Sequence, residues 1–310
     1  MAHNEEKVIQ KAVQSGLTQK TPSGFTVQIV VVANGCSDRT EEIVKELEDR
    51  NPQGVVLVSI KDKGKTKAIN RAIAYFAELS RKDLLIPYVI FLDADCQFLG
   101  EDVLINFINR FEHTPQLCAV GANCLPDVLF NKRHDLVSNT YRAISNFGDL
   151  LKINSISGMC YAIKYDTLAK INFPNIQFNE DMYVSSRLDG WFFRDKHIKV
   201  VFTTPYNLSH ELKRRTRQEV STQRYHQYYS SLKQKGIMVR LYEKPLNDDY
   251  RWLGPGDNHA FRMFFSLKGI KSKFFLTGYG LTRLWAKINA YYILKSVNKN
   301  QETDFWEVLR

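Results

Sequence analysis

Residues 88–95, Tyr-Val-Ile-Phe-Leu-Asp-Ala-Asp, join a continuous apolar run to two carboxylates that are two positions apart. Such a run predicts a strand buried on both faces of a sheet, here ending at Asp93. The carboxylates of Asp93 and Asp95 repel each other unless a hard cation, Mg²⁺ or Mn²⁺, lies between them. An Asx turn followed by a helix cap also fits this short pattern, so the residues alone leave both interpretations open.

Alternation of apolar strands and amphipathic helices extends on both sides of this stretch. Strands are predicted at residues 26–33, 55–60, 88–92, 158–163 and 197–202, and helices at 4–19, from 40, at 66–79, 102–112, 179–188 and 213–235. Residues 127–155 are predicted to mix helix and loop. The pattern predicts an α/β fold with an open, mostly parallel sheet and helices on both faces. Ligands of such sheets bind beyond the carboxyl ends of the strands, where Asn34 and Asp93 fall.

The composition is that of a globular protein, with 310 residues, 44% hydrophobic and 25% charged. A formal charge of +10 favours an anionic partner, and the absence of any nucleic-acid-binding motif favours a diphosphate or an anionic membrane over nucleic acid. The five cysteines form no Cys-x-x-Cys pair, which indicates a reducing compartment. No signal peptide or membrane-spanning run is visible, so we expect a cytoplasmic protein, with peripheral contact at the inner face of the cell membrane left open.

Three further motifs carry charge. Glu180 and Asp181 open a predicted helix, where acids complement the helix dipole or take a proton from an attacking hydroxyl. Lys65 follows Gly64 at another helix start, which suits either an anion site or a solvated basic loop. The basic run 214–226, which includes Arg224, either clamps a diphosphate or forms a solvated helix face. His210, just upstream, is either a metal ligand or a surface histidine.

In this order, the motifs resemble those of family 2 glycosyltransferases, which have the GT-A fold. The resemblance covers residues 2 to about 226 and rests on Ala-His-Asn-Glu-Glu at 2–6, Asn-Gly-Cys-Ser-Asp at 34–38, Gly64-Lys65, Asp-Ala-Asp at 93–95, Glu180-Asp181 and Gln-Arg-Tyr at 223–225. It implies inverting transfer of a sugar from a nucleotide-sugar donor to a hydroxyl acceptor. A UDP-sugar is the expected donor, and a glycan or a lipid-linked saccharide in cell-envelope synthesis is the expected acceptor.

The resemblance also assigns roles to single residues. Ala2 and Glu5 would border the nucleoside, Asn34 and Asp38 the base and ribose, Lys65 the diphosphate or base, and Arg224 the diphosphate. Asp93 would face the ribose or the metal, Asp95 would be the main ligand of Mn²⁺ or Mg²⁺, Asp181 would be the general base, and Glu180 would support it.

The sequence departs from the family pattern at several positions. Asn34 stands where many relatives have aspartate, which is expected to soften base specificity but keeps a hydrogen-bonding side chain. Tyr225 replaces a tryptophan and Ser221 occupies a Gln/Arg position, which puts binding of a growing polymer in doubt. Relatives also have an apolar strand before the segment at 2–6, whereas only Met1 stands there in this sequence. The first strand is therefore expected to be missing, either because the sequence is part of a longer one or because another segment fills the gap.

We expect residues 1–240 to form the catalytic domain and residues 241–310 a basic aromatic extension. With Trp285, Tyr291 and Tyr292 among Arg283 and Lys287, the extension would associate with a membrane or pack on the catalytic domain. Two other functions fit the motifs less well. One is a non-catalytic or degenerate nucleotide-sugar-binding protein, and the other is a sugar nucleotidyltransferase, which would carry a glycine-rich signature near its first strand.

Overall fold

The computed structural model describes residues 1–82, 84–145, 156–176, 178–188, 190–235 and 270–296. The chain divides into two compact units. Unit 1 comprises residues 1–125 and 155–202, and unit 2 comprises residues 126–154 and 203–310. The predicted domain boundary near residue 240 lies outside the described residues and stays a prediction. Each unit is described by itself below.

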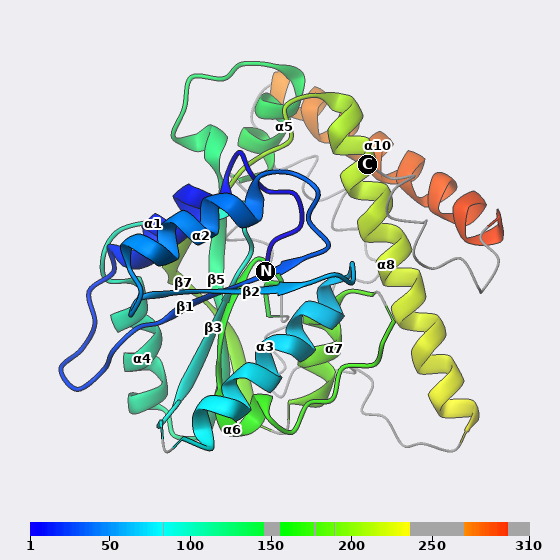
Figure 1. The fold of residues 1–310 in the computed structure, drawn as a ribbon. Helices are drawn as coiled ribbons and strands as arrows, with labels where there is room; N and C mark the ends of the chain where they lie inside the picture. Colours follow the sequence, from blue (N-terminus) through cyan, green and yellow to red (C-terminus); the bar gives the residue numbers. More distant parts are fainter. Residues whose placement is uncertain (83, 146–155, 177, 189, 236–269, 297–310) are drawn as a thin grey trace. The chain divides into compact units, whose positions relative to one another are not determined.

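Unit 1 contains a parallel two-stranded sheet. Its strands are β1 (Ile29–Asn34) and β2 (Val55–Ile60), with Ile29 opposite Val55. Three helices accompany this sheet: α1 (Ile9–Leu17), α2 (Thr40–Arg50) and α3 (Lys65–Ser80). Val31 packs with α1 and α2, whereas Val30 and Val32 pack with α3. Figure 1 shows α2 and α3 on opposite sides of the two strands. Because successive strand residues face opposite sides, the helices cover both faces, as the sequence predicts.

A five-stranded sheet forms the rest of the core of unit 1. Its strand order is β3-β6-β5-β7-β4. The strands are β3 (Tyr88–Leu92), β4 (Cys96–Phe98), β5 (Leu117–Pro126), β6 (Cys160–Lys164) and β7 (Trp191–Phe202). The helix α4 (Val103–His113) packs on it through Phe107 and Phe111. Short helix α6 (Tyr165–Leu168) follows β6, and α7 (Glu180–Arg187) precedes β7.

The strand pairings differ in part from the sequence prediction. The pair β1–β2 is parallel, but β3–β6, β5–β6 and β4–β7 are antiparallel. The sequence prediction contained neither β4 nor β5. Strand β4 has only three residues, and β5 contains glycine, alanine and cysteine in place of a β-branched run, so neither gives a strong strand pattern.

The expected absence of a first strand is visible beside β1. Ala2 forms a single parallel bridge to Ala33, in which the N–H of Ala2 donates to the carbonyl of Val32 at 2.9 Å and the N–H of Asn34 donates to the carbonyl of Ala2 at 2.9 Å. Among the described residues, no strand precedes this bridge along β1, and β3 forms the outer edge of its own sheet.

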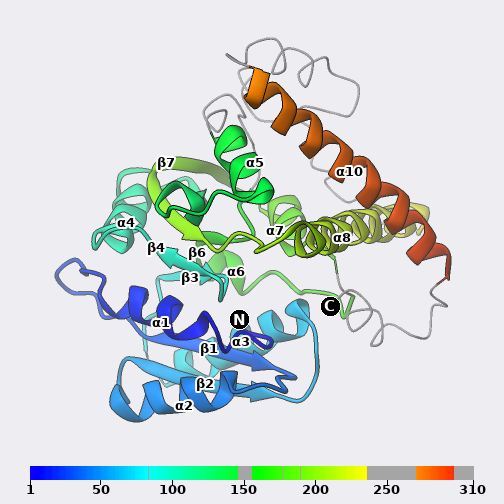
Figure 2. The ribbon, with the colours of Figure 1, turned by 90° about the horizontal axis from the view of Figure 1, so that it is seen from above.

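The described part of unit 2 is helical. It consists of the 3₁₀ turn Asp127–Leu129, α5 (Leu136–Ser145), α8 (Leu208–Gln234) and α10 (Ile270–Ser296), of which α8 and α10 lie side by side (Figure 2). Ala290 of α10 packs against Val220 of α8. Asn207 caps the start of helix α8, and its side chain accepts the N–H of His210 at 3.0 Å. In the part of the chain that the structure describes, no helix is both long enough and apolar enough to cross a bilayer.

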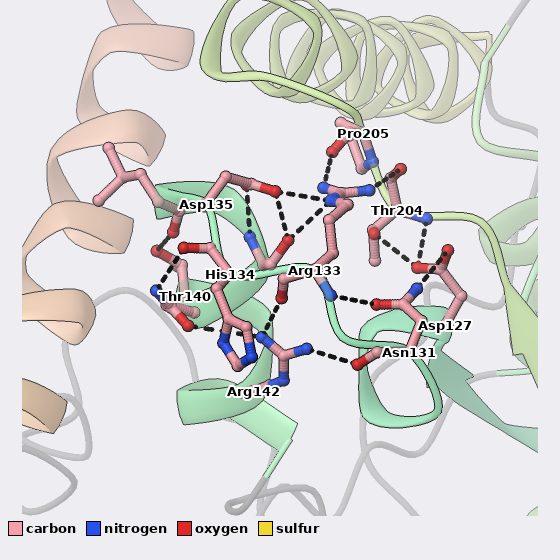
Figure 3. A network of polar contacts seen from close by, with 12 residues as sticks. Asp127, Asn131, Arg133, His134, Asp135, Thr140, Arg142, Thr204 and Pro205 are labelled. Atoms are coloured by element: carbon pink, nitrogen blue, oxygen red, sulfur yellow. Dashed lines mark hydrogen bonds and ion pairs between the residues drawn. The ribbon is translucent and has the colours of Figure 1, made fainter.

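Arg133 ties the start of α5 to the segment before α8 (Figure 3). Its guanidinium donates to the carboxylate of Asp135 at 2.6 Å and to the carbonyls of Thr204 and Pro205. The carboxylate of Asp127 accepts from the N–H of Thr204 at 3.0 Å and from its hydroxyl at 2.6 Å. Because these charges are matched by near neighbours, the network stabilises unit 2.

All five cysteines are free thiols, and Cys96, Cys118 and Cys160 are buried. Burial raises the pKa of the thiols of Cys96 and Cys160 well above the ordinary value, so both stay neutral.

Candidate active site

Four carboxylates and one ammonium group gather in unit 1 at the end of β3. Asp93 follows β3 directly, because its N–H still pairs with the carbonyl of Met159 at 2.9 Å. Asp95 is two residues further on, while Glu180 and Asp181 form the first turn of α7. The structure therefore brings the predicted acids of the 93–95 motif and of the 180–181 motif into the same unit.

Lys65 links the two acidic motifs. Its Nζ lies 2.7 Å from Asp93 Oδ1 and 2.5 Å from Glu180 Oε1, and it donates to the carbonyl of Gly158 at 3.4 Å. Burial opposes the positive charge, but the carboxylates of Asp93 and Glu180 outweigh it and raise the pKa of Lys65 well above its ordinary value. A single permanent cation thus joins residues that are far apart in the sequence.

One positive charge does not balance the acids around it. Burial is the main cause that raises the pKa of Glu180, and the charges of Asp181 and Asp93 add to it, so that the value reaches about 7 although Lys65 lowers it. Burial likewise raises the pKa of Asp181, against the hydrogen bond in which Met182 N–H donates to its Oδ1 at 2.9 Å. Carboxylates whose pKa values approach neutrality can accept a proton from a substrate hydroxyl.

The carboxylate of Asp95 also has a raised pKa. Burial and the negative charge of Asp93 both raise its pKa. Repulsion of this kind is relieved by a divalent cation, as the spacing in the sequence predicts. However, the described residues contain no cluster of three or more histidine, cysteine, aspartate or glutamate side chains that could hold a metal ion alone.

Two residues of the site were missed by sequence reasoning. A Cβ atom on Gly158 would lie 3.1 Å from Glu180 Oε1 and 3.2 Å from Asp181 Cγ, so only glycine admits both acids without displacement. Tyr161 stacks on Phe91, with ring centroids 4.8 Å apart, and its buried hydroxyl has no hydrogen-bond partner among the described residues. A glycine just before a predicted strand is a weak signal of close approach, and nothing in the sequence distinguishes Tyr161.

The predicted nucleoside-binding residues form a second group, in which the loop that follows β1 is bonded to the N-terminal segment and to the loop at Gly64. Asn34 is 4% exposed, and its side chain donates to the carbonyl of Ala2 at 2.8 Å and accepts the N–H of Gly64 at 3.1 Å. Asp38 accepts from the N–H of Glu6 at 3.1 Å and from the N–H of Thr40 at 3.0 Å. Burial would raise the pKa of Asp38, but its bonds to Thr40 and Glu6 lower it overall.

The N-terminal segment is held against the same loop. The N–H of Glu5 donates to Thr40 Oγ1 at 2.7 Å, and Asn4 Nδ2 donates to Ser37 Oγ at 2.9 Å. Hydrogen bonds therefore join residues 2–6 and 34–40 into one unit, here called the frame. The bond from Gly64 N–H to the side chain of Asn34 connects this frame to the start of α3, where Lys65 lies. The side chain of Asn34 is used to hold this frame together.

Other predicted site residues lie in unit 2. His210 is exposed in the first turn of α8, and Arg224 lies further along that helix with 9% of its surface exposed. Their predicted roles in binding metal and diphosphate stay predictions. In the same helix, Arg214 and Arg215 pair with Glu211, and Arg215 also stacks over the ring of Tyr279 at 4.0 Å, so their guanidinium groups stabilise unit 2.

In open α/β sheets ligands bind beyond the carboxyl ends of the strands, and Asp93 and Asp95 lie beyond the end of β3. The family model "Glycosyl transferase family 2" matches residues 1–171, more than half of the chain. The chain therefore belongs to glycosyl transferase family 2, and it is a glycosyltransferase.

One of the similar solved structures supports the same fold. The mannosyltransferase PcManGT from Pyrobaculum calidifontis, in complex with GDP-Man and Mn²⁺, has a TM-score of 0.53 at 18% identity, with 99% of this chain and 76% of that chain covered. TarS 1–349 from S. aureus has a TM-score of 0.46 at 16% identity, over 71% of this chain and 64% of that chain. No curated protein matches the chain. The GT-A fold and the family expected from the sequence are confirmed.

Proposed function

We propose that the protein transfers a sugar, with inversion, from a nucleoside-diphosphate sugar to a hydroxyl acceptor, and that Asp181 is the general base. The observation that carries this proposal is the contact of Lys65 with both Asp93 and Glu180. Through Lys65, Asp93, which is proposed to lie near the donor, comes close to Glu180, which neighbours the proposed base Asp181. Inverting transfer needs this arrangement, because the acceptor attacks the anomeric carbon opposite the leaving diphosphate.

The contacts of the acid pair divide its roles. Glu180 is engaged by Lys65, whereas Asp181 accepts hydrogen bonds from the backbone N–H groups of Met182 and Gly158. Asp181 is therefore the carboxylate suited to take the acceptor proton. Glu180 keeps Lys65 in place, and burial together with the negative charge of Asp93 raises the pKa of Asp181. No covalent enzyme intermediate is needed.

A divalent cation fits the acids at the end of β3. Asp93 and Asp95 would hold Mn²⁺ or Mg²⁺, because carboxylate oxygens are hard ligands and the repulsion that raises the pKa of Asp95 would be relieved. Oxygen atoms of the donor diphosphate would complete the coordination, since the described side chains supply too few ligands alone. Such a cation neutralises the charge that develops on the leaving diphosphate. The Mn²⁺ in the PcManGT complex supports the proposal.

The donor is proposed to bind beside the frame of residues 2–6 and 34–40. Ala2 and Glu5 would border the nucleoside, and Asp38, whose lowered pKa keeps it ionised, would accept from ribose hydroxyls. A UDP-sugar remains the expected donor. The GDP-Man bound to PcManGT makes a GDP-sugar the rival that has to be tested first.

The proposed acceptor is a glycan or a lipid-linked saccharide presented at an anionic membrane. One face of α10 supports this proposal, because six large side chains at helical spacing are exposed: Leu281, Leu284, Trp285, Ile288, Tyr291 and Tyr292. The opposite face packs through Ala286 and Ala290, which are 2% and 0% exposed. A stripe of aromatic and aliphatic residues on a chain of charge +10 suits the interface of an anionic membrane.

A screen of nucleotide-sugars tests the activity. Purified protein is incubated with UDP- and GDP-sugars and Mn²⁺ or Mg²⁺, and release of the free nucleotide is measured. We expect slow hydrolysis of one donor, which stops in Asp181→Asn while binding of that donor is retained. Asp166→Asn, which changes an exposed aspartate of α6, is the matched control and should keep wild-type turnover.

The same screen separates the alternatives. A non-catalytic binding protein would bind a donor but release nothing in any variant. A sugar nucleotidyltransferase would release pyrophosphate from a nucleoside triphosphate and a sugar phosphate. Full turnover in Asp181→Asn would refute the assignment of the base.

A further inference from the structure

The hydroxyl of Tyr161 is a buried polar group that the proposed reaction does not use. The side chain is 1% exposed, and the hydroxyl has no hydrogen-bond partner among the described residues. Buried side-chain polar atoms nearly always have a partner, because an unpaired one carries the full cost of its desolvation. An exception beside the candidate active site points to a partner that comes within reach when the site binds its substrate.

The ring of Tyr161 is fixed by packing, so its hydroxyl has a defined position. Tyr161 lies opposite Phe91 in the β3–β6 pair, and the two rings stack with centroids 4.8 Å apart. On β5 it lies opposite Gly121, which has no side chain. The β3–β6 pairing continues to Asp93, whose N–H donates to the carbonyl of Met159 at 2.9 Å. Because strand residues two positions apart share a face, Tyr161 lies on the face of the sheet to which Phe91 and Asp93 belong.

The charged groups of the candidate active site act on this hydroxyl. Burial raises the pKa of Tyr161 well above its ordinary value, and the negative charge of Glu180 adds the next largest effect. Weaker effects come from Lys65, Asp181 and Asp93. A phenol that stays neutral remains an O–H donor, and an ionised carboxylate only accepts hydrogen bonds. Glu180 is therefore the acceptor best matched to the hydroxyl of Tyr161.

In the structure, Glu180 is held by Lys65. An ammonium group has three N–H donors, and that of Lys65 contacts three acceptors: Asp93, Glu180 and the carbonyl of Gly158. Lys65 can bind the diphosphate of a donor only if it releases one of them. Asp181 loses no partner in such an exchange, because its hydrogen bonds come from backbone N–H groups. Release of Glu180, in contrast, leaves a buried carboxylate that requires another donor.

We propose that Tyr161 is a positioning residue for the acid pair: its hydroxyl donates a hydrogen bond to Glu180 when Lys65 turns to the donor diphosphate. The bond gives the unpaired hydroxyl and the released carboxylate a partner at the same time. It keeps Glu180 beside the base Asp181, so that binding of the donor is coupled to the placement of the base. This inference rests on the proposed function, and the experiment below separates its failure from that of the proposed donor.

Tyr161→Phe tests the proposal, because it removes the hydroxyl and keeps the ring. Without nucleotide, the variant should melt at the wild-type temperature or higher, since the hydroxyl has no bond to lose. In calorimetric titrations with Mn²⁺, its Kd for UDP or GDP, whichever the wild type binds, should be about fivefold to tenfold higher. Its kcat with the identified substrates should fall by about tenfold or more. A lower melting temperature with wild-type Kd and kcat is the mark of a merely structural hydroxyl and would overturn the proposal.

Tyr88→Phe is the matched control. It removes a phenolic hydroxyl at the opposite end of β3 from Asp93, where the hydroxyl of Tyr88 donates to the carboxylate of Glu112. Because this hydroxyl is already paired, its loss should lower the melting temperature slightly and leave the Kd of the nucleotide at the wild-type value. The two variants are therefore expected to change stability and nucleotide affinity in opposite ways.

A double-mutant cycle tests whether Glu180 is the partner. In a Glu180→Ala background, where the acceptor is absent, Tyr161→Phe should change the Kd of the nucleotide by less than about twofold. An undiminished effect of Tyr161→Phe in that background would overturn the proposal. If the wild type binds neither UDP nor GDP with Mn²⁺, the proposed donor fails and this inference fails with it. If the wild type binds one of them and Tyr161→Phe binds it equally well, this inference alone is overturned.

Discussion

At the scale of single residues, the site depends on the close approach of like charges. Lys65 neutralises part of the charge of Asp93 and Glu180, and Gly158 leaves the space that Glu180 and Asp181 occupy. The raised pKa values of Glu180 and Asp181 follow from their burial and from this incomplete neutralisation. Such an arrangement costs stability, and active sites keep it because a carboxylate of raised pKa is a better base near neutral pH.

Gly158→Ala should lower kcat by about tenfold or more, because a shift of tenths of an ångström in Asp181 disturbs the alignment with the acceptor. The added Cβ would lie 3.1–3.3 Å from atoms of Glu180 and Asp181, so we expect only a small change in melting temperature. Steady-state kinetics with the identified donor and acceptor measure the effect. Gly278→Ala, where nothing lies within 4 Å, is the control; wild-type kcat in Gly158→Ala would show that the acids do not need this space.

The pH profile of kcat should show an acid limb above the pH at which an ordinary carboxyl group ionises. The base works only when it is ionised, and burial raises the pKa of Asp181 and raises that of its neighbour Glu180 to about 7, so the rate falls as pH drops through the raised pKa of the base. The limb belongs to the pair of acids rather than to one of them. Glu180→Gln removes one negative charge and should move the limb to lower pH. A wild-type limb near pH 4, the value of an ordinary carboxyl group, would contradict the prediction.

Sequence reasoning found the acids and the lysine because strand ends and helix starts are visible in the pattern. It could not find their mutual distances, since the contact of Lys65 with Glu180 joins positions 115 residues apart in the chain. Nor could it show that Asn34 uses its side chain to hold Ala2 and the loop at Gly64. Both facts depend on how the loops pack, which no local pattern encodes.

At the scale of elements, strands with β-branched runs were predicted well and the others were not. The predicted bounds of β2 and β3 agree with the structure, whereas β1 begins at Ile29 rather than at Thr26. Strand β7 begins at Trp191, six residues before the predicted start at His197, because its first half mixes aromatic and charged residues. The antiparallel pairings of β6 could not be predicted, because strand direction is set by tertiary structure.

Helix α10 gives the clearest test at this scale. Ile288→Ser removes one apolar side chain from the exposed stripe and should lower partition to anionic vesicles by about fivefold, on the basis of about 1 kcal/mol for a partly buried aliphatic side chain. Sedimentation with vesicles that contain phosphatidylserine measures the effect. Phe130→Ser, which removes an exposed apolar residue elsewhere in unit 2, is the control and should bind as the wild type does. Equal loss in both variants would exclude a specific role for α10.

At the scale of the whole molecule, the site acids all belong to unit 1, whereas Arg224, His210 and the stripe of α10 belong to unit 2. The compact units interleave along the chain, with residues 126–154 grouped with the C-terminal helices. The predicted domain boundary near residue 240 stays a prediction. A linear sequence gives little sign of such interleaving, because the contact that joins Arg133 to Thr204 and Pro205 spans about 70 positions.

Nucleotide and metal should stabilise the molecule together. Ligands that bind only the folded chain add about 2.7 kcal/mol at one hundred times their Kd, which corresponds to a rise of several degrees in melting temperature. We expect this rise with the identified nucleoside diphosphate and Mn²⁺, and its loss with EDTA or in Asp95→Asn. The control Asp166→Asn should keep it. A full rise for Asp95→Asn would remove this residue from the metal site.

The buried thiols of Cys96 and Cys160 can be used to follow the local opening of unit 1 without mutating the protein. A thiol must be exposed and ionised before an alkylating reagent reacts with it, and both conditions fail while the sheet is closed. Alkylation of these two positions, read by mass spectrometry against the half-exposed Cys36, therefore reports the opening rate of the sheet without an introduced probe. The native cysteines therefore serve as probes of local unfolding.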